Sequence, residues 1–375
     1  MGLKKHNLSS SAISQHTGGF GPRSNGLRRV LTLAAAIVIF LALRWSVEFM
    51  RDADAPRIQL LLVAILTGGA GAWLLYWMAD SLVSLLPSQR LQDFLRPVIF
   101  VGPAIALLLV FLVYPAISTI VLSFKDKQSV KFIGFDNYVQ AFTQPVMQQA
   151  FLNNVIWMVL VTSCSVALGL IVAVLFDRVR YEAMAKAWIF LPLVISFVGA
   201  SVIWRFIYAY QPVGRPQTGL LNALMVAAGE DPIGWLTKRQ FNTIALIVIM
   251  IWLQTGFCMV VLSAALKSLP AEILDAARID GAGEVQIFFK IIIPNLKPTL
   301  ITVATTVLIA VLKVFDIVYV MTNGQYNTEV IANRMYASMF KDRNFGLGSA
   351  LAVLLLVAVV PVMVANVRSL RKERS

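Results

Sequence analysis

The sequence predicts an all-α membrane protein, a polytopic bundle of about eight transmembrane helices. Hydrophobic residues make up 58% of the 375 residues and charged residues only 14%, with a mean hydropathy of +0.77. A water-soluble domain does not need so much apolar material. A helix needs about 20 apolar residues to cross a bilayer. Eight runs of this kind occur, at residues 30–49, 58–79, 97–124, 151–176, 187–208, 243–266, 299–320 and 349–367.

The part of the chain around the first two runs differs from the rest. Residues 1–29 are polar and contain many serines and glycines, which favours a disordered cytoplasmic tail. The first two runs are joined by a short link, and we interpret residues 30–95 as a two-span N-terminal extension. From residue 96 the spans contain prolines and the links are longer. Residues 96–375 are therefore interpreted as a six-span core.

The distribution of positive charge indicates the orientation of the chain. The net charge is +13. With a cytoplasmic N-terminus, eighteen of the 32 Lys and Arg residues fall in cytoplasmic segments and eleven in outer loops, while Arg44, Arg205 and Lys313 fall within spans. An excess of Lys and Arg marks the cytoplasmic side, and an even number of spans puts both termini on one side. We expect cytoplasmic termini and membrane lipid as surroundings, and no nucleic-acid partner.

Few residues are of a type that could catalyse a reaction or bind a metal. Cys164 and Cys258 lie within predicted spans, and the two histidines, His6 and His16, lie in the polar tail. This arrangement argues against a disulfide framework and a histidine-ligated metal centre. The sequence also lacks a P-loop and the short motifs of metalloproteases and serine hydrolases. We expect no catalytic residue, no metal and no directly bound cofactor.

Between the sixth and seventh runs, the segment 270–294 combines charged and apolar residues. Pro270 can begin a helix, with acidic residues near its positive end. Ile273, Ala276, Ala277 and Asp280 then fall on one face at helical spacing. The two alanines lie at the centre of this face, and small side chains allow another molecule to approach closely.

A sharp turn follows this first short helix. Gly281 permits it, and we expect this glycine to adopt a backbone conformation that other residues disfavour. A second amphipathic piece covers residues 284–291, and Pro294 is expected to close it before the next span. The residues alone leave two interpretations open: a helix–turn–helix elbow that docks onto another protein, or a pair of helices lying on the bilayer surface.

The same segment resembles the cytoplasmic EAA loop of ABC importer permeases. The family pattern is E-A-A, three residues, G, nine residues and I-x-L-P. Here Asp275-Ala276-Ala277 is followed by Gly281 and then by Ile291-x-Ile293-Pro294 at these spacings, with Asp for Glu and Ile for Leu. In the family this loop is a coupling helix that docks into a cleft of the ATPase. The resemblance implies a cytoplasmic coupling-helix loop whose ATPase-coupling residues are Asp275, Ala276, Ala277, Asp280, Gly281, Ile291 and Pro294.

The resemblance extends over residues 97–370. The stretches FIGFDNYVQAF, FLPLVISFVGASVIWRFIY and KVFDIVYVMTNG look like carbohydrate permeases of the maltose and glycerol-3-phosphate type. SFVGASVIWRFIYAY and GLLNAL are similar to α-glucoside permease subunits. This implies a permease subunit of an ABC importer for an α-glucoside or a glucosylated osmolyte, in the bacterial inner membrane. The implied partners are a homologous second permease, two copies of an ATPase subunit that uses ATP, and an external solute-binding protein.

A sugar requires polar groups and flat apolar faces along its path through an apolar bundle. By resemblance to the maltose-type subunit, Phe197, Gln254 and Phe257 match sugar contacts. The candidate substrate-path residues are Phe197, Trp252, Gln254, Phe257 and Asp316. Alternatives stay open, because Lys313 and Asp316 could only neutralise each other and Trp252 could only pack. Aliphatic residues at other matching positions leave open that the partner permease carries the pocket.

Two other functions are compatible with the sequence. One is an ABC permease for another small solute, such as an amino acid or phosphate. The other is an ion-coupled secondary transporter, which would need ionisable residues near the middle of the bilayer. Apart from Lys313 and Asp316, such residues are few.

Overall fold

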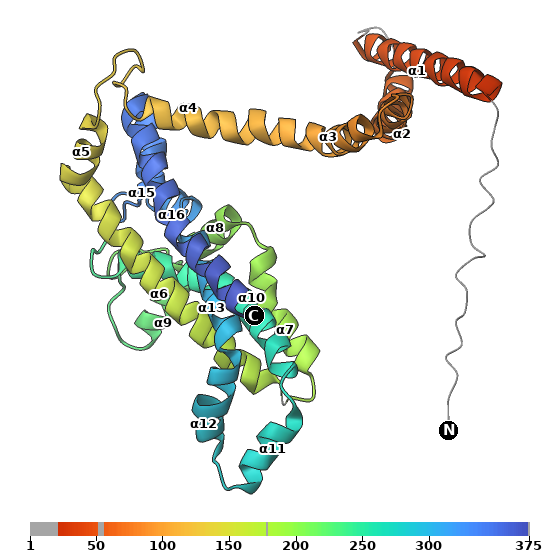
Figure 1. The fold of residues 1–375 in the computed structure, drawn as a ribbon. Helices are drawn as coiled ribbons and strands as arrows, with labels where there is room; N and C mark the ends of the chain where they lie inside the picture. The colour runs from red at the N-terminus through yellow and green to blue at the C-terminus, as the bar shows by residue number, and fades with distance from the viewer. Residues whose placement is uncertain (1–21, 52–55, 178, 374–375) are drawn as a thin grey trace, which may run out of the picture. The chain divides into compact units, whose positions relative to one another are not determined.

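The structure, a computed structural model, is built of helices (Figure 1). It describes residues 22–51, 56–177 and 179–373, and their side chains from residue 30 to residue 364. Within these ranges the only β pairing is an isolated antiparallel bridge between Lys125 and Phe132. Seven of the described helices are long and apolar enough to cross a membrane, and a bent helix pair makes an eighth if it counts as one span. The predicted all-α polytopic fold class is confirmed.

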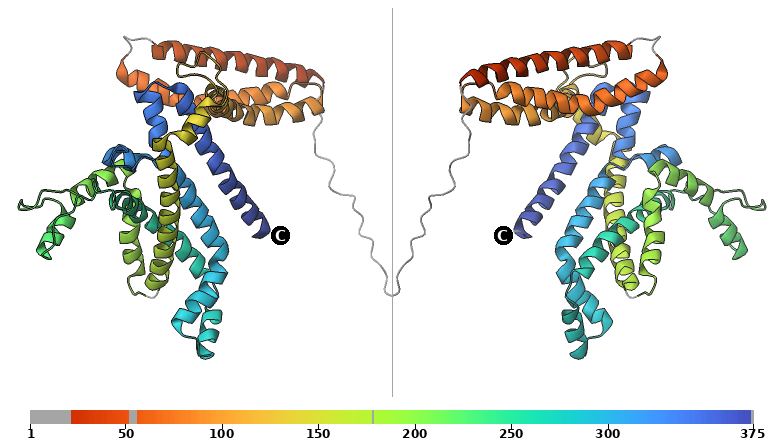
Figure 2. Two further views of the ribbon diagram at one scale, coloured as in Figure 1. Left: turned by 90° about the vertical axis from the view of Figure 1, so that its left-hand side faces the viewer. Right: turned by 90° about the vertical axis from the view of Figure 1, so that its right-hand side faces the viewer.

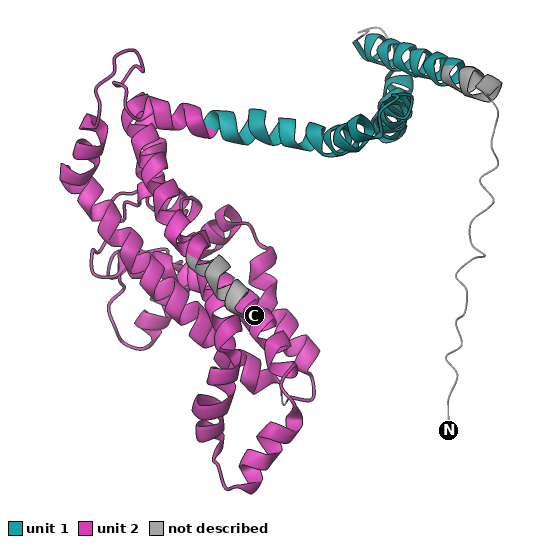
Figure 3. Cartoon of the chain, viewed as in Figure 1, with its two compact units in different colours: residues 1–115 teal, residues 116–375 magenta. Residues whose placement is uncertain are grey.

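The chain divides into two compact units, Met1–Pro115 and Ala116–Ser375 (Figure 3). The helices up to this division are α1 (Pro22–Arg51), α2 (Arg57–Val83), α3 (Gln89–Leu108), the π-helical turn η1 (Leu109–Val113) and α4 (Tyr114–Leu122), which contains the division. The helices beyond it are α5 (Asp136–Thr143), α6 (Pro145–Phe176), α7 (Glu182–Phe190), the 3-10 turn η2 (Leu191–Val194), α8 (Phe197–Ile207), α9 (Leu220–Ala227), α10 (Asn242–Lys267), α11 (Ala271–Ile279), α12 (Glu284–Ile287), the π-helical turn η3 (Phe288–Ile292), α13 (Ile293–Leu312), α14 (Asp316–Met321), α15 (Ile331–Tyr336), the π-helical turn η4 (Ala337–Lys341) and α16 (Phe345–Glu373).

The first unit is a set of long apolar helices with little burial. An added Cβ at Gly71 of α2 would lie 3.1 Å from Leu43 Cδ2 of α1, so this glycine allows the two helices to approach closely. Arg96 of α3 donates to Asp80 of α2 at 3.1 Å. In α2 only Gly71 and Val83 are buried, and in α3 no residue is. Such helices leave their apolar side chains free to face lipid.

The start of α1 differs from the prediction. The sequence indicates a disordered tail over residues 1–29, whereas α1 begins at Pro22 and includes residues 22–29. Proline is favoured in the first turn of a helix because its missing N–H would have no partner there. Residues 1–21 of the predicted tail lie outside the described residues.

In the second unit, α6 and α10 form the centre of the core, with α13 packed against both (Figure 2). α6 and α10 cross at Gly169, where an added Cβ would lie 2.5 Å from Cys258 Cβ and 2.9 Å from Met259 N. Both cysteines of the chain are free thiols, as expected. The side chains with almost no exposed surface include Trp157, Leu246, Ile249, Leu253, Met259 and Leu262.

The predicted span 187–208 is not one continuous helix. Its two parts, Glu182–Val194 and Phe197–Ile207, meet at an angle of 102°. Pro192 lies in η2 and has no N–H for a helical hydrogen bond. Ser196 then caps the new helix α8, since its Oγ accepts a hydrogen bond from Gly199 N at 3.0 Å. A hydropathy pattern does not detect this change of direction, because both arms are apolar.

The predicted span 299–320 also differs from the structure at both of its ends. The helix ends at Leu312, residues 313–315 are non-helical, and α14 starts at Asp316. At the other end, Pro294 does not close the preceding helical piece, because Glu284–Leu312 forms one apolar helix. Pro294 is the second residue of α13, and Ile293 separates it from η3. The π-helical turn η3 interrupts the regular hydrogen-bond ladder just before Pro294. The missing N–H of proline is accommodated at this irregularity, so the helix continues.

The segment between α14 and α15 is tied to α6 by polar contacts. Asn153 Nδ2 donates to the carbonyl oxygens of Asn327 and Glu329 at 2.7 and 2.8 Å. The buried Glu329 carboxylate accepts hydrogen bonds from Val330 N and Asn333 Nδ2. Burial raises the pKa of Glu329, and the two hydrogen bonds oppose this effect. These bonds hold this end of the core together.

The crossing of α6 and α10 leads to a first prediction. Gly169→Ala should reduce the stability of the purified protein by about 1–3 kcal/mol, because the new methyl group overpacks against Cys258. The measurement is the midpoint of thermal unfolding in detergent. Gly68→Ala is the matched control, since an added Cβ at this helical glycine meets nothing within 4 Å. Equal midpoints for the two variants would contradict the close crossing.

Candidate coupling loop and substrate path

Residues 270–294, here called the elbow, lie at one end of the second unit (Figure 1). α11 follows the end of α10 after a short link, and α12 leads through η3 into α13. α11 and α12 project beyond the ends of α7 and α10 (Figure 1). The elbow is therefore the link between two apolar helices of the core, as expected.

The turn of the elbow depends on Gly281. Its φ is +81°, the left-handed conformation that residues with a side chain rarely adopt. Ala282 N donates to Ala277 O at 2.9 Å and Gly281 N donates to Arg278 O at 3.1 Å. These two bonds form a Schellman motif, which ends α11 and satisfies its last carbonyl groups. The expected conformation of Gly281 is confirmed.

An arginine that the sequence analysis did not single out spans this turn. Arg278 Nη1 donates to Asp275 Oδ1 at 2.8 Å, and Arg278 Nε donates to Glu284 Oε1 at 3.0 Å. Glu284, and then Asp275, hold the pKa of Arg278 above its usual range. The spacing Asp275–Arg278 at i, i+3 could have indicated the first pair. The second pair depends on the geometry of the turn, so spacing alone could not reveal it.

The predicted coupling residues divide into two groups by exposure. Those exposed are Asp275, Ala276, Asp280, Gly281 and Pro294. Ala277 and Ile291 are half-buried, because they pack against the core of their own chain. They support the elbow from inside.

The elbow also exposes large apolar side chains. Ile279 is 86% exposed, Val285 71% and Phe289 62%. These residues lie at the end of α11, in α12 and in η3. Exposed aliphatic and aromatic groups of this size, next to the charged groups of the turn, are typical of a surface that another protein or the bilayer covers. Ile279 was missed by the sequence analysis, because it lies off the alanine face.

The structure brings Phe197 and Asp316 together. Both line a small cavity of about 30 Å³. The lining residues are Phe197, Met250, Ala310, Lys313, Val314, Phe315, Asp316 and Ile317. Gln254 lies one turn after Met250 on α10, and Phe257 follows on the same face. Gln254 is buried and Phe257 is partly buried.

Trp252 belongs to a different hollow. With about 100° per residue, it lies about 200° around α10 from Gln254. Its ring packs edge-on against Trp204 of α8, with centroids 5.8 Å apart. The hollow has a volume of about 340 Å³, and it is lined by Leu168, Trp188, Ile189, Pro192, Trp204, Val248, Ile251, Trp252 and Thr255. The candidate residues therefore form two groups and not one.

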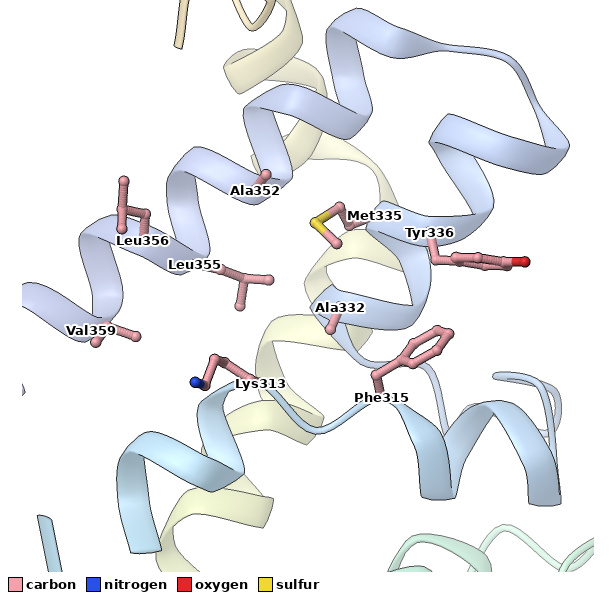
Figure 4. Close-up of a pocket in the computed structure, with 9 residues that line it drawn as sticks. All are labelled: Lys313, Phe315, Ala332, Met335, Tyr336, Ala352, Leu355, Leu356 and Val359. Carbon is pink, nitrogen blue, oxygen red and sulfur yellow. The ribbon is translucent and has the colours of Figure 1, made fainter. Parts of the chain in front are cut away.

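Lys313 lies between the small cavity and a larger one of about 570 Å³ (Figure 4). In the close-up, Lys313 and Phe315 come from the segment between α13 and α14, and they face α15 and α16. The other lining residues are Ala332, Met335, Tyr336, Ala352, Leu355, Leu356 and Val359. Among the described residues, no salt bridge joins Lys313 to Asp316. A continuous helix would favour that i, i+3 pair, but the chain leaves the helix at Lys313.

No group of three or more His, Cys, Asp or Glu side chains within the described ranges is arranged to hold a metal ion.

Comparison with known proteins then identifies the chain. Residues 165–373 match the family described as binding-protein-dependent transport system inner membrane component. The chain belongs to this family. The match includes the elbow and every candidate substrate-path residue. The protein is therefore an inner membrane permease subunit of an ABC transporter and not an enzyme.

The permease has relatives along most of its length. It is 57% identical over 274 residues to the osmoprotective compounds uptake permease protein GgtC of Synechocystis, a match covering 73% of this chain and 98% of GgtC. It is 42% identical over 345 residues to the alpha-glucoside transport system permease protein AglF of Rhizobium meliloti, covering 92% of this chain and 97% of AglF. The lactose transport system permease protein LacF of Rhizobium radiobacter is 34% identical over 232 residues, a match covering 60% of this chain and 76% of LacF.

Solved structures support the fold of the permease. A bacterial ABC transporter involved in the import of the acidic polysaccharide alginate matches with a TM-score of 0.65 and 24% identity. The match covers 76% of this chain and 99% of that chain. At this identity the similarity concerns the fold alone.

Proposed function

We propose that this permease is the transmembrane subunit of an ABC importer for a sugar or glucoside, either an α-glucoside or a glucosylated osmolyte. The similarity to AglF over 92% of the chain carries this proposal. The similarity to GgtC at 57% identity supports an osmolyte as the solute. Proposed partners are a homologous second permease, two copies of an ATPase subunit and an external solute-binding protein. The ATPase subunits bind and use the ATP, and this chain binds no cofactor itself.

The experiment that tests the proposal uses the complete complex in lipid vesicles. ATP hydrolysis and uptake should rise when the binding protein is supplied with trehalose or glucosylglycerol. Proline and inorganic phosphate serve as comparison solutes. Stimulation only by one of these would favour an ABC permease for another small solute. Uptake driven by a sodium or proton gradient without the ATPase would favour a secondary transporter.

The elbow is proposed to dock onto the ATPase. The exposed side chains of Ile279, Val285 and Phe289 supply an apolar contact surface, and the Gly281 turn and the Arg278 pairs hold its two helices at a fixed angle. In the mechanism, ATP binding closes the ATPase dimer and carries the elbow with it. The bundle then changes from inward-facing to outward-facing. The exposed residues proposed for this contact are Asp275, Ala276, Asp280, Gly281 and Pro294, and Ala277 and Ile291 are proposed to support them from inside.

The substrate path is proposed to run past one face of α10. Gln254 is a buried amide near the middle of α10, and Phe197 and Asp316 lie near the same face. An amide and a carboxylate can hydrogen-bond sugar hydroxyls, and the phenyl ring of Phe257 offers a stacking face. Trp252, in the neighbouring hollow with Trp204, is proposed as a second aromatic contact. The second permease completes the path from its own side.

The proposed organisation of the chain is a two-span extension over residues 30–95 and a six-span core over 96–375. About a hundred residues of this chain lie outside its match to GgtC, although that match covers 98% of GgtC. This difference supports the extension as an addition to a core that transports without it.

Both termini are predicted to lie in the cytoplasm, because the segments on that side carry the larger share of Lys and Arg. Reporter fusions before Met1 and after Ser375 should both give cytoplasmic signals. A signal from the outer side at either end would mean that the number of spans is wrong.

The proposed substrate path predicts the effect of two substitutions. Gln254→Leu and Phe257→Ala should each weaken solute-dependent uptake, because a lost hydrogen bond or stacking face typically costs about 1–3 kcal/mol. The measurement is the solute dependence of uptake, with assembly with the ATPase checked by co-purification. Val260→Ala, at an exposed position of α10, is the control. Unchanged uptake in both variants would assign the pocket to the partner permease.

The elbow predicts the effect of a matched pair of glycine substitutions. Gly281→Asp should strain the left-handed turn by about 1–3 kcal/mol and introduce a charge at the proposed docking surface. Transport and co-purification of the ATPase should both fall sharply, while membrane levels stay normal. Gly283→Asp is the control, because Gly283 has an ordinary φ of −69° and open space around it.

The alternative, a helix pair on the bilayer surface, makes the opposite forecast. Such a pair could lose its turn without losing the ATPase. If Gly281→Asp reaches the membrane, keeps the ATPase and transports normally, the elbow is not a coupling loop.

A further inference from the structure

Four polar side chains join α7 to α10 at the elbow end of the core. Glu182 Oε1 accepts a hydrogen bond from Lys267 Nζ at 2.6 Å. Lys186 Nζ donates to the same carboxylate oxygen and also to Ser263 Oγ. Glu182 and Lys186 are one turn apart on α7, and Ser263 and Lys267 are one turn apart on α10. Each of the two α7 residues therefore contacts one residue of α10: Glu182 contacts Lys267, and Lys186 contacts Ser263.

Three of these side chains are partly withdrawn from solvent, whereas the side chain of Lys267 is 54% exposed. The side chain of Lys186 is 14% exposed and that of Glu182 is 26% exposed, and Ser263 is buried. Asp177, just after α6, adds further attraction on Lys267. A charge pair that is partly desolvated is more sensitive to the loss of one partner than a fully exposed pair. These contacts therefore fix the two helices to each other.

α7 and α10 also touch near the other end of α7, without polar side chains. An added Cβ at Gly256 of α10 would lie 2.5 Å from Ile189 O and 2.9 Å from Phe190 Cα. The glycine thus allows the backbones to meet. α7 and α10 therefore touch at both ends of α7, and a sliding movement of one helix along the other would break at least one of these two contacts.

The polar contact between α7 and α10 lies between two segments of the chain that have proposed functions. α10 ends at Lys267 and continues directly into the elbow, whereas α7 continues through η2 into the 102° bend. Beyond the bend, α8 begins with Phe197, which lines the small cavity next to Asp316. The polar contact thus joins the start of the elbow to the helix that leads into the candidate substrate path.

We propose that Glu182, Lys186, Ser263 and Lys267, here called the α7–α10 clamp, are positioning residues that transmit movement of the elbow to the bend before Phe197. The clamp makes α7 and α10 one rigid body, so that a displacement of the elbow rotates the α7 arm of the bend. Without the clamp, the elbow follows the ATPase while α7 stays behind. The inference rests on the proposed transport function, because it needs an ATPase that moves the elbow.

The test measures uptake and ATP hydrolysis in the same vesicles, with the complete complex, the binding protein and trehalose or glucosylglycerol as the solute. Glu182→Gln keeps the shape of the side chain and removes its charge. The number of solute molecules imported per ATP should fall roughly fivefold or more, while ATP hydrolysis continues. Fivefold is about the lower end of the change that typical couplings between two sites produce. Glu48→Gln is the matched control, because Arg44 and Glu48 form an i, i+4 pair on α1 at 2.9 Å.

A charge exchange gives a second, independent measurement. Glu182→Lys alone and Lys267→Glu alone should both lower the ratio of import to hydrolysis. The double variant again has one carboxylate and two lysines, now with both lysines on α7 and the carboxylate on α10, so the attraction between the helices returns and most of the ratio should recover. A structural defect from either substitution would not be cured by adding the other.

The outcomes separate this inference from the proposed function. If the unaltered complex shows no uptake that depends on the binding protein, the proposed function fails. If it transports and Glu182→Gln leaves the ratio unchanged, or lowers import and hydrolysis in equal proportion, the clamp does not couple the two movements. A double variant that stays as impaired as the single ones would also overturn the proposal.

Discussion

Backbone hydrogen bonding in a medium without water constrains this permease more than any other interaction. In the hydrocarbon layer a free N–H or C=O has no solvent partner, so each span must be a helix or must supply a partner where the helix stops. The core leaves helical geometry at residues 195–196 and 313–315. At the first break Ser196 Oγ accepts from Gly199 N, and at the second Val314 N donates to Val311 O at 3.0 Å. Phe197 and Asp316 directly follow these breaks and line one cavity.

The apolar spans could be predicted from the sequence because lipid selects side chains by average polarity over a whole helix. The same average hides where a helix bends. Pro192 lies in a run that is apolar on both sides, so hydropathy treats the 102° bend as one straight span. Lys313 is one charge in an apolar run, and nothing in the local pattern states that the helix stops there. Pro294 gives the opposite error, because a proline predicts a helix end, whereas the π-helical turn before it allows the helix to continue.

The elbow was more predictable than the substrate path, for a geometric reason. A turn between two short helices is a local structure, and the position of Gly281 after the alanine pair determines its conformation almost alone. The path depends on which face of α10 meets which neighbour. Helical spacing separates Trp252 from Gln254, but only packing against α8 assigns Trp252 to the hollow beside Trp204. The pairing of Arg278 with Glu284 likewise needs the turn to exist first.

The turn at Gly281 selects by handedness and not by size. An added Cβ on its L side meets nothing within 4 Å, yet a φ of +81° disfavours every L-amino acid that carries one. The mirror-image preference follows: a D-amino acid favours positive φ, so D-alanine would suit the backbone at this position where L-alanine would strain it. The absence of a side chain at residue 281 therefore reflects the chirality of protein building blocks, and not a lack of room around the elbow.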